Sequence, residues 1–504
     1  MIEIWLNSIM KKKHHCKARI QSYWISDVLV PVIAVLILVP NLNKPMFRDE
    51  AFTLISSTQS INSLCSEITQ TNFSYVFYYS LLHIWTLMAD NIVWIRFFSL
   101  ACYGGALVVV SKIYRLLMPN LTSIVVVLIC ALNPLFIQSA LYARPYALSA
   151  LLSSLFIHSV LKKRKSKHSI FLAAIFFVLL MCLTEIFSII LCCSCLVFIY
   201  FSHHHQKPSW KNLSWGGIML LPLPLLLVMS KIQSSGLDWI KQYFYSTPLF
   251  VNLEGPASSS TGLFPIAGSG LYPIGVIALL CLGLLSYLTR RKNKTLRLVA
   301  RWDLGLIATW AFLPTLAMVG ISLVHPIYIT RYITYSVPGL AILMAIACES
   351  IYTNFTLIKS QIVKSILLSS VLGAALVWTF ITCDIPVAKT YAYNLWSAEK
   401  YLASSGGPNV EIVLPTISLK TAISYYANVD HNSFTYWPQG KNIWSATSLN
   451  LEKATFASAS SNVWLVYENS YDDAPIVASL REHGYAQTGT TLIEGVALIH
   501  FERH

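Results

Sequence analysis

Residues 170–201 read IFLAAIFFVLLMCLTEIFSIILCCSCLVFIYF, an apolar stretch with one glutamate as its only charged residue. Because a hydrocarbon span needs about 17–25 apolar residues, this stretch predicts two consecutive membrane helices at 169–187 and 188–202. Basic residues precede it at 162–167 and follow it at 207–211. The stretch therefore predicts a helical hairpin whose two ends lie on the same, cytoplasmic side of a membrane.

The composition of the whole chain agrees with that interpretation. Of 504 residues, 55% are hydrophobic and 12% are charged, and the mean hydropathy is +0.59. A soluble globular protein carries about 25% charged residues, so these numbers argue against soluble, disordered, collagen-like and coiled-coil proteins. Further apolar stretches of spanning length lie at 24–40, 94–117, 121–139, 145–161, 213–230, 271–288, 303–323, 332–350 and 365–383. The sequence therefore predicts an α-helical polytopic membrane protein with about eleven transmembrane helices.

The distribution of basic residues predicts the topology. Alternating the spans from a cytoplasmic N-terminus places 22 of the 36 Lys and Arg residues in cytoplasmic segments, 7 in outer loops and 7 after residue 384. This asymmetry follows the positive-inside rule, so the net charge of +14 indicates topology and not nucleic-acid binding. A cleavable signal peptide is the competing interpretation of the first span, but Val39, Pro40 and Asn41 make a poor cleavage site.

The apolar stretch from Tyr75 to Met88 is not counted as a span. Its length of about 14 residues is marginal for crossing, and counting it would move the basic clusters at 112–115 and 162–167 to the outer side. Its tyrosines and Trp85 are typical of interfacial helices. We expect it to lie in the outer interface or dip into it.

The character of the chain changes at Asp384, and from this residue onward 11 acidic residues exceed 7 basic ones. Apolar runs at 410–414 and 463–467 predict buried strands, and 394–404 and 474–483 predict amphipathic helices. We expect three parts: a basic cytoplasmic N-terminus (1–23), a transmembrane part (24–383) and a small extracytoplasmic α/β domain (384–504).

Three consecutive charged residues, Arg48, Asp49 and Glu50, follow the first span. Adjacent carboxylates beside an arginine can supply a general base, a metal ligand or an ion-pair anchor. Taken alone, they are more typical of a solvated loop, so their interpretation depends on where the other charges lie.

Further ionisable and aromatic residues are expected on the same outer face. They are Tyr142, Arg144, Tyr146, Glu185, Asp238, Trp239, His325, Arg331 and Tyr332. Burying charge in the hydrocarbon is expensive, so charges gathered near it indicate function. A carboxylate with two arginines beside a lipid-facing cavity suits a phosphate leaving group and an acceptor hydroxyl.

Several of these residues also have a structural interpretation. Arg144 can pair with an acid of the first outer loop, and Arg331 can reach lipid headgroups. Trp239 can anchor at the interface, and Glu185 is more often a hydrogen-bonded structural acid than a catalyst. The histidines at 203–205 look like a metal tract, but they are expected in the cytoplasm.

The order of these features resembles the GT-C membrane glycosyltransferases, in particular the glycosyltransferase family 39 group, which includes protein O-mannosyltransferases and the lipid A aminoarabinose transferase. The resemblance covers residues 20–385 and rests on the order of several motifs, none of which is specific alone. The motifs are FRDEAFT at 47–53, YVFYYSLLHIW at 75–85, WIRFFS at 94–99, NPLF at 133–136, ARPYAL at 143–148, DWI at 238–240 and RY at 331–332.

The resemblance implies a GT-C-like fold and an inverting transfer of a sugar from a polyprenyl phosphate. It implies that Asp49 is the general base for the acceptor hydroxyl and that Glu50 supports Asp49 or positions the acceptor. It implies that the donor phosphate binds Arg331, assisted by Arg144 and Tyr332. The cavity would also include Arg48, Tyr142, Tyr146, Asp238, Trp239 and His325.

The chain also departs from this group. Tyr142 stands where many relatives carry a glutamate, Phe73 and Ser74 replace two prolines, and no second acid lies near Tyr146. These departures argue against a metal bridged between two carboxylates. No cofactor is expected, and a requirement for a divalent metal stays open.

We therefore expect a cell-membrane glycosyltransferase of envelope biogenesis that transfers a sugar, mannose being the commonest in the resembling group. The donor is a polyprenyl-phosphate sugar, and the acceptor hydroxyl lies outside the cytoplasm on a glycan, glycolipid or protein. Membrane lipids are expected partners, and nucleic acid is not. The alternatives are a transporter or lipid flippase, although no internal repeat typical of transporters is evident, and a scaffold for envelope assembly.

Overall fold

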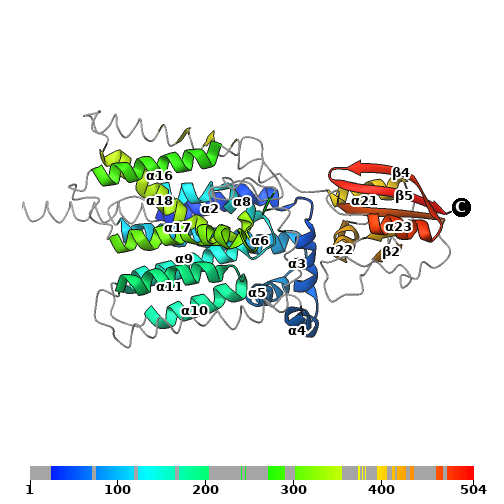
Figure 1. Cartoon of the computed structure of the whole chain (residues 1–504), viewed down its shortest axis with the longest axis horizontal. Coiled ribbons are helices and arrows are strands. Elements are labelled where there is room, and N and C mark those ends of the chain that lie inside the picture. Colours follow the sequence, from blue (N-terminus) through cyan, green and yellow to red (C-terminus); the bar gives the residue numbers. More distant parts are fainter. Residues whose placement is uncertain are drawn as a thin grey trace, which may run out of the picture.

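A computed structural model of the chain describes residues 24–70, 75–118, 123–164, 170–203, 271–289, 301–354, 394–405, 411–414, 417–426, 432–435, 461–468 and 474–503, with a few positions within 240–245 and 370–381. Helices make up the described chain as far as residue 354, and a sheet with its covering helices follows. Figure 1 shows the C-terminal part, residues 394–503, at one end of the bundle; we call it the C-terminal α/β region.

The helical part consists of long apolar helices and several short ones. They are η1 (Ile25–Leu29), α2 (Val30–Leu38), η2 (Val39–Leu42), α3 (Arg48–Thr58), α4 (Ile61–Gln70), α5 (Val76–Thr86), α6 (Ile92–Leu117), α7 (Ile124–Ala131), α8 (Pro134–Leu141), α9 (Tyr146–Arg164), α10 (Ile170–Thr184), α11 (Ser188–His203), α16 (Leu271–Thr289), α17 (Arg301–Ser322), η6 (Thr330–Ser336) and α18 (Val337–Asn354).

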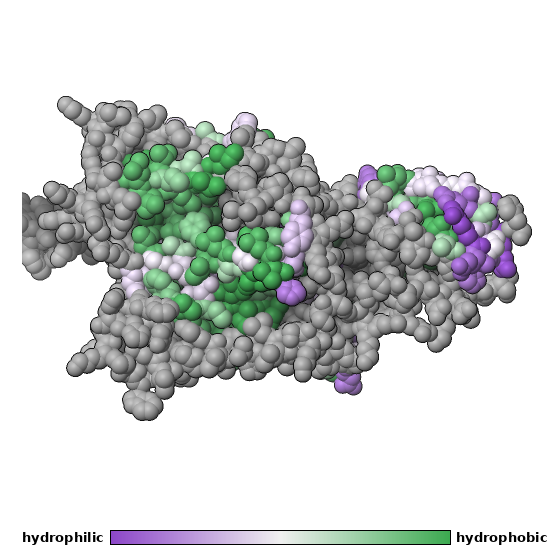
Figure 2. Space-filling model, viewed as in Figure 1, coloured by the Kyte–Doolittle hydropathy of each residue, from purple (hydrophilic) through white to green (hydrophobic). Residues whose placement is uncertain are grey.

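Apolar surface and helix length identify a multi-pass membrane protein. Within the described chain, four helices are long and apolar enough to cross a membrane, or five if the bent pair α7 and α8 forms one span. Figure 2 shows hydrophobic residues over a broad area of the bundle and hydrophilic ones on the C-terminal α/β region. Nine of the predicted spans coincide with helices. The span at 213–230 and most of the span at 365–383 lie outside the described residues, so the total of eleven stays a prediction.

The continuous span predicted over 121–139 is wrong in one respect, because the structure forms two helices that meet at an angle of 66°. Asn133 has an extended backbone and its side chain accepts a hydrogen bond from the Phe136 amide, which starts α8. Pro134 has no amide hydrogen to continue the preceding helix. An asparagine cap followed by proline therefore ends one helix and begins the next.

Three short helices, α3, α4 and α5, lie near the end of the bundle that faces the C-terminal α/β region (Figure 1). Helix α5 confirms the helix predicted within 75–88. Apolar side chains at Ile84, Leu87 and Met88 are exposed, which is consistent with a place in the membrane interface. Figure 1 shows α3 crossing this end of the bundle, so residues at its beginning lie between the two parts of the molecule.

The C-terminal α/β region is built on a mixed five-stranded sheet in the order β2-β1-β3-β5-β4. Its strands are β1 (Glu411–Leu414), β2 (Asn432–Thr435), β3 (Asn462–Glu468), β4 (Tyr485–Ile493) and β5 (Val496–Arg503), and its helices are α21 (Leu395–Ser405), α22 (Ile417–Tyr426) and α23 (Ala474–Glu482). Strand β1 runs parallel to β2 and β3, and β5 runs antiparallel to β3 and β4.

Alternating side chains bury both faces of this sheet. Ile412 and Leu414 of β1 face the core shared with α21, α22 and the helical part, whereas Val413 faces the core formed with α23. Helix α22 also packs against α3. The hydrophobic core of the helical part thus continues into one side of the sheet.

Candidate active site

A buried arginine organises the loop that precedes α3. Arg96, in the first turns of α6, is fully buried, and its guanidinium uses all five N–H groups. It donates to the carbonyl oxygens of Leu42 (2.6 Å), Lys44 (2.7 Å) and Pro45 (3.1 Å) and twice to Glu50. One side chain therefore fixes the path of the chain from the first span to α3.

The Glu50 carboxylate is fully occupied by these contacts. Its oxygens accept from Arg96 Nε (2.9 Å) and Nη2 (2.7 Å) and from the amides of Phe47 (3.1 Å) and Ala143 (2.9 Å). Burial alone would raise the pKa of Glu50, but the charge and hydrogen bonds of Arg96, with smaller effects of Lys44 and the Ala143 amide, lower it below its usual value. Four accepted hydrogen bonds fill its lone pairs, so Glu50 serves as an ion-pair anchor.

The neighbouring acid, Asp49, faces a different cation. Its Oδ2 atom lies 3.5 Å from Nη2 of Arg331, and the two side chains are 10% and 13% exposed. Asp49 lies in the first turn of α3, whereas Arg331 lies in η6, between α17 and α18. The structure thus brings together a carboxylate and a guanidinium from distant parts of the sequence.

Hydrogen bonds from three helices hold η6 in place. The Tyr335 carbonyl accepts from Trp310 Nε1 (2.7 Å) and Ser153 Oγ (3.0 Å), and the hydroxyls of Ser139 and Thr334 lie 3.1 Å apart. The backbone at Ile333 is non-helical, with φ −108° and ψ 15°. This irregular segment positions Arg331 against α3.

Aromatic rings lie beside both Arg144 and Arg331. The Arg144 guanidinium carbon lies 5.4 Å from the centre of the Tyr75 ring, and the side chain is almost completely buried between α8 and α9. The Tyr146 and Tyr332 rings are 6.1 Å apart, and Phe187 stacks on Tyr332 at 4.6 Å. Arg144 thus lies beside the Tyr75 ring, and the Arg331 guanidinium carbon lies 5.6 Å from the centre of the Tyr332 ring.

A second buried acid lies near these arginines. Glu185 occupies the turn between α10 and α11 and accepts a hydrogen bond from Ser149 Oγ at 3.1 Å. The charges of Arg144 and Arg331 both act on this carboxylate. No acid lies near Tyr146 in the sequence. The fold nevertheless brings the Glu185 carboxylate to Ser149, which is three residues after Tyr146.

Lys44 places a buried amine near Glu50. Its Nζ atom lies 3.9 Å above the centre of the Tyr142 ring and has no hydrogen-bond partner among the residues that the structure describes. Burial, followed by the charge of Arg96, lowers the pKa of Lys44 to about 7, although Glu50 opposes the change. The Phe47 ring meets the Tyr142 ring edge-on, with 6.3 Å between their centres.

Two crystal structures of ArnT from Cupriavidus metallidurans, one bound to undecaprenyl phosphate and one in the apo state, are similar to the whole of this chain. Each has a TM-score of 0.54 and 12% sequence identity, over 94% of this chain and 97% of ArnT. The chain has the GT-C glycosyltransferase fold. Family models give no match to the sequence, and neither do curated proteins.

Within this GT-C fold, the predicted site residues fall into three groups. The structure gathers Asp49, Arg331, Arg144, Tyr146, Tyr332, Glu50 and Tyr142 around the start of α3 and η6. His325 is exposed in the turn after α17, apart from the contacts given above. Asp238, Trp239 and the side chain of Arg48 lie outside the described residues.

The roles of Arg96 and Lys44 were not predicted from the sequence. Arg96 belongs to the WIRFFS motif at 94–99. An arginine at the start of an apolar run is costly to bury, and this pattern could have identified it as a structural or functional residue. Lys44 was counted only as a charge of the outer loop, because no pattern indicated that its amine would be buried.

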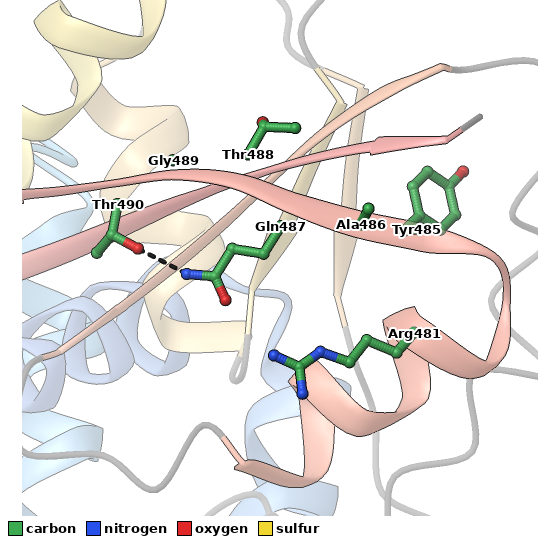
Figure 3. Close-up of a pocket in the computed structure, with 7 residues that line it drawn as sticks. All are labelled: Arg481, Tyr485, Ala486, Gln487, Thr488, Gly489 and Thr490. Carbon is green, nitrogen blue, oxygen red and sulfur yellow. Dashed lines mark hydrogen bonds between the residues drawn. The ribbon is translucent and has the colours of Figure 1, made fainter.

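Potential metal ligands and a surface hollow are further features of the described residues. The described residues contain no group of three or more His, Cys, Asp or Glu side chains that could hold a metal ion. A hollow of about 520 Å³ lies on the C-terminal α/β region, where Arg481 of α23 faces the edge strand β4 (Figure 3). Its lining includes Gln487 and Thr490, which share a hydrogen bond, and it holds no acid.

Proposed function

We propose that this protein is a membrane glycosyltransferase that transfers a sugar from a polyprenyl phosphate to an acceptor hydroxyl outside the cytoplasm, with inversion. The observation that carries the proposal is the pairing of Asp49 with Arg331 within a GT-C fold. The undecaprenyl phosphate bound to ArnT supports a polyprenyl-phosphate donor. Mannose is the first donor sugar to test.

The two cations suit the leaving group of this reaction. Arg331 is paired with Asp49, and Arg144 lies nearby, beside the Tyr75 ring. A donor phosphate at this position would take over the contact with Arg331, which separates the guanidinium from Asp49. Cations aimed at the phosphate oxygens stabilise the charge that develops there as the sugar leaves.

Asp49 is then available as the general base. The acceptor hydroxyl gives its proton to the Asp49 carboxylate while its oxygen attacks the anomeric carbon from the side opposite the phosphate. The bond between that carbon and the phosphate oxygen breaks, and the polyprenyl phosphate leaves with the electron pair. Glu50 does not take a proton in this scheme because its four hydrogen bonds hold it as an anchor for the loop and for α3.

Substitution of Asp49 tests the proposal. In proteoliposomes with a radiolabelled polyprenyl-phosphate sugar and extracted envelope acceptors, we expect Asp49→Asn to lower kcat by about 100- to 10,000-fold, the usual contribution of a general base. The matched control is Asp90→Asn, because Asp90 is an exposed carboxylate in the turn between α5 and α6. Turnover by the Asp49→Asn variant close to that of the wild type would refute the base assignment. A wild-type protein that moves the lipid across the bilayer without transferring label would favour a flippase.

A further inference from the structure

The C-terminal α/β region touches the chain immediately before the candidate base. Tyr426, the last residue of α22, accepts a hydrogen bond at its hydroxyl oxygen from the Met46 amide at 2.8 Å. Met46 is fully buried and lies three residues before Asp49. This hydrogen bond therefore links a distant part of the chain to the segment that leads into α3.

The same segment is held on its other side by the helical part. Arg96 binds the carbonyl oxygens of Leu42, Lys44 and Pro45, and Glu50 binds the Phe47 amide. Pro45 has no amide hydrogen, so the Met46 amide is the next donor along the chain. Tyr426 thus completes a set of backbone contacts that otherwise comes from Arg96 and Glu50.

The support behind Tyr426 is a packed helix. Leu419, Ala422 and Ile423 of α22 are buried in the core that continues from the helical part, and α22 packs along α3. The Tyr426 side chain is partly buried. Its hydroxyl is therefore carried by a fixed element and not by a free loop.

We propose that Tyr426 is a positioning residue, through which the C-terminal α/β region sets the location of Asp49. This inference rests on the proposed function, because it assumes that Asp49 is the base. Phe47 is the N-cap of α3 and Asp49 follows in its first turn, so a shift of the Met46 backbone moves the carboxylate. Misplacing a catalytic group by about 1 Å can cost about 100-fold in rate.

The test compares two neighbouring tyrosines. Tyr426→Phe removes one hydroxyl and keeps the ring, and Tyr425→Phe makes the same chemical change at a side chain that is 40% exposed. We expect Tyr426→Phe to lower kcat by about tenfold, as the loss of a buried amide partner implies, and to leave the donor KM within about twofold because the arginines are unaffected. Tyr425→Phe should retain wild-type values.

Hydrogen exchange supplies a readout that does not depend on activity. Peptides covering residues 42–52 should exchange faster in Tyr426→Phe than in the wild type and Tyr425→Phe, since the Met46 amide loses its acceptor. Unchanged kcat with unchanged exchange, or equal losses in both variants, would overturn the proposal. If the wild type shows no transfer, the proposed function fails, while faster exchange in Tyr426→Phe would still show that Tyr426 holds this segment.

Discussion

Asp49 and Glu50 are adjacent in the sequence but have different partners in the structure. Successive residues of an α-helix point about 100° apart, so one carboxylate meets Arg331 and the other meets Arg96. The sequence identified the acid pair as a candidate site. The resemblance implied Asp49 as the base and Glu50 as its support, but the partner of each acid could not be predicted, because the two arginines come from α6 and η6.

Because the Lys44 amine is buried, we expect the stability of the folded protein to depend on pH. Its pKa is lowered from 10.5 to about 7, so the unfolded chain holds more protons than the folded protein between those values. The destabilising effect of burying the Lys44 amine is therefore largest at pH 7 and below, and it decreases as pH rises from 7 toward 10.5. Lys44→Met should raise the melting temperature relative to the wild type at pH 6.5, and by much less at pH 9.

Lys400→Met is the matched control for this measurement. The Lys400 amine also lies over an aromatic ring, 3.8 Å from the centre of Trp396, but its side chain is exposed. Its substitution should shift the melting temperature equally at both pH values. A pH-independent difference between Lys44→Met and the wild type would contradict the burial of the Lys44 amine.

At the scale of elements, α16 and α18 approach each other closely at Gly283. A Cβ atom built there would lie 2.3 Å from Cβ and 2.7 Å from Cα of Ala347, which cannot move without moving α18. Such small-residue contacts let membrane helices pack backbone to backbone. We expect Gly283→Ala to destabilise the detergent-solubilised protein by about 1–3 kcal/mol, measured by thermal unfolding.

Gly275 on the same helix is the control, because nothing lies within 4 Å of its added Cβ. Gly275→Ala should be neutral or stabilising by up to about 1 kcal/mol, since alanine favours the helix. Equal melting temperatures for the Gly283→Ala variant and the wild type would show that the two helices are not in contact at this point.

Element boundaries were predictable where a strong local signal exists. The apolar runs that predict α6 and α9 end close to the observed bounds, and the strands at 410–414 and 463–467 are β1 and β3. The hairpin of β4 and β5 was missed, although Glu494 and Gly495 form its two-residue turn, both with positive φ. The bend between α7 and α8 was missed because the apolar run continues through Pro134.

At the scale of the whole molecule, the charge asymmetry predicts which side of the membrane holds the C-terminal α/β region. If the basic segments lie in the cytoplasm, this region and the start of α3 lie outside it. In a bacterial host, alkaline phosphatase fused after residue 504 should be active, and a fluorescent protein at the same place should be dark. The reverse pattern would place the proposed site on the cytoplasmic face and contradict the topology.

The sequence by itself determined that the chain is a helical membrane protein, and it selected Asp49, Arg144 and Arg331 as candidates, because hydrophobicity and charge are local properties. The tertiary structure decided which charges meet. It paired Glu50 with Arg96 and Asp49 with Arg331, brought Glu185 near the arginines and placed Tyr426 behind the Met46 amide. Those contacts join residues that are far apart in the chain, and only the packing of helices against one another brings them within reach.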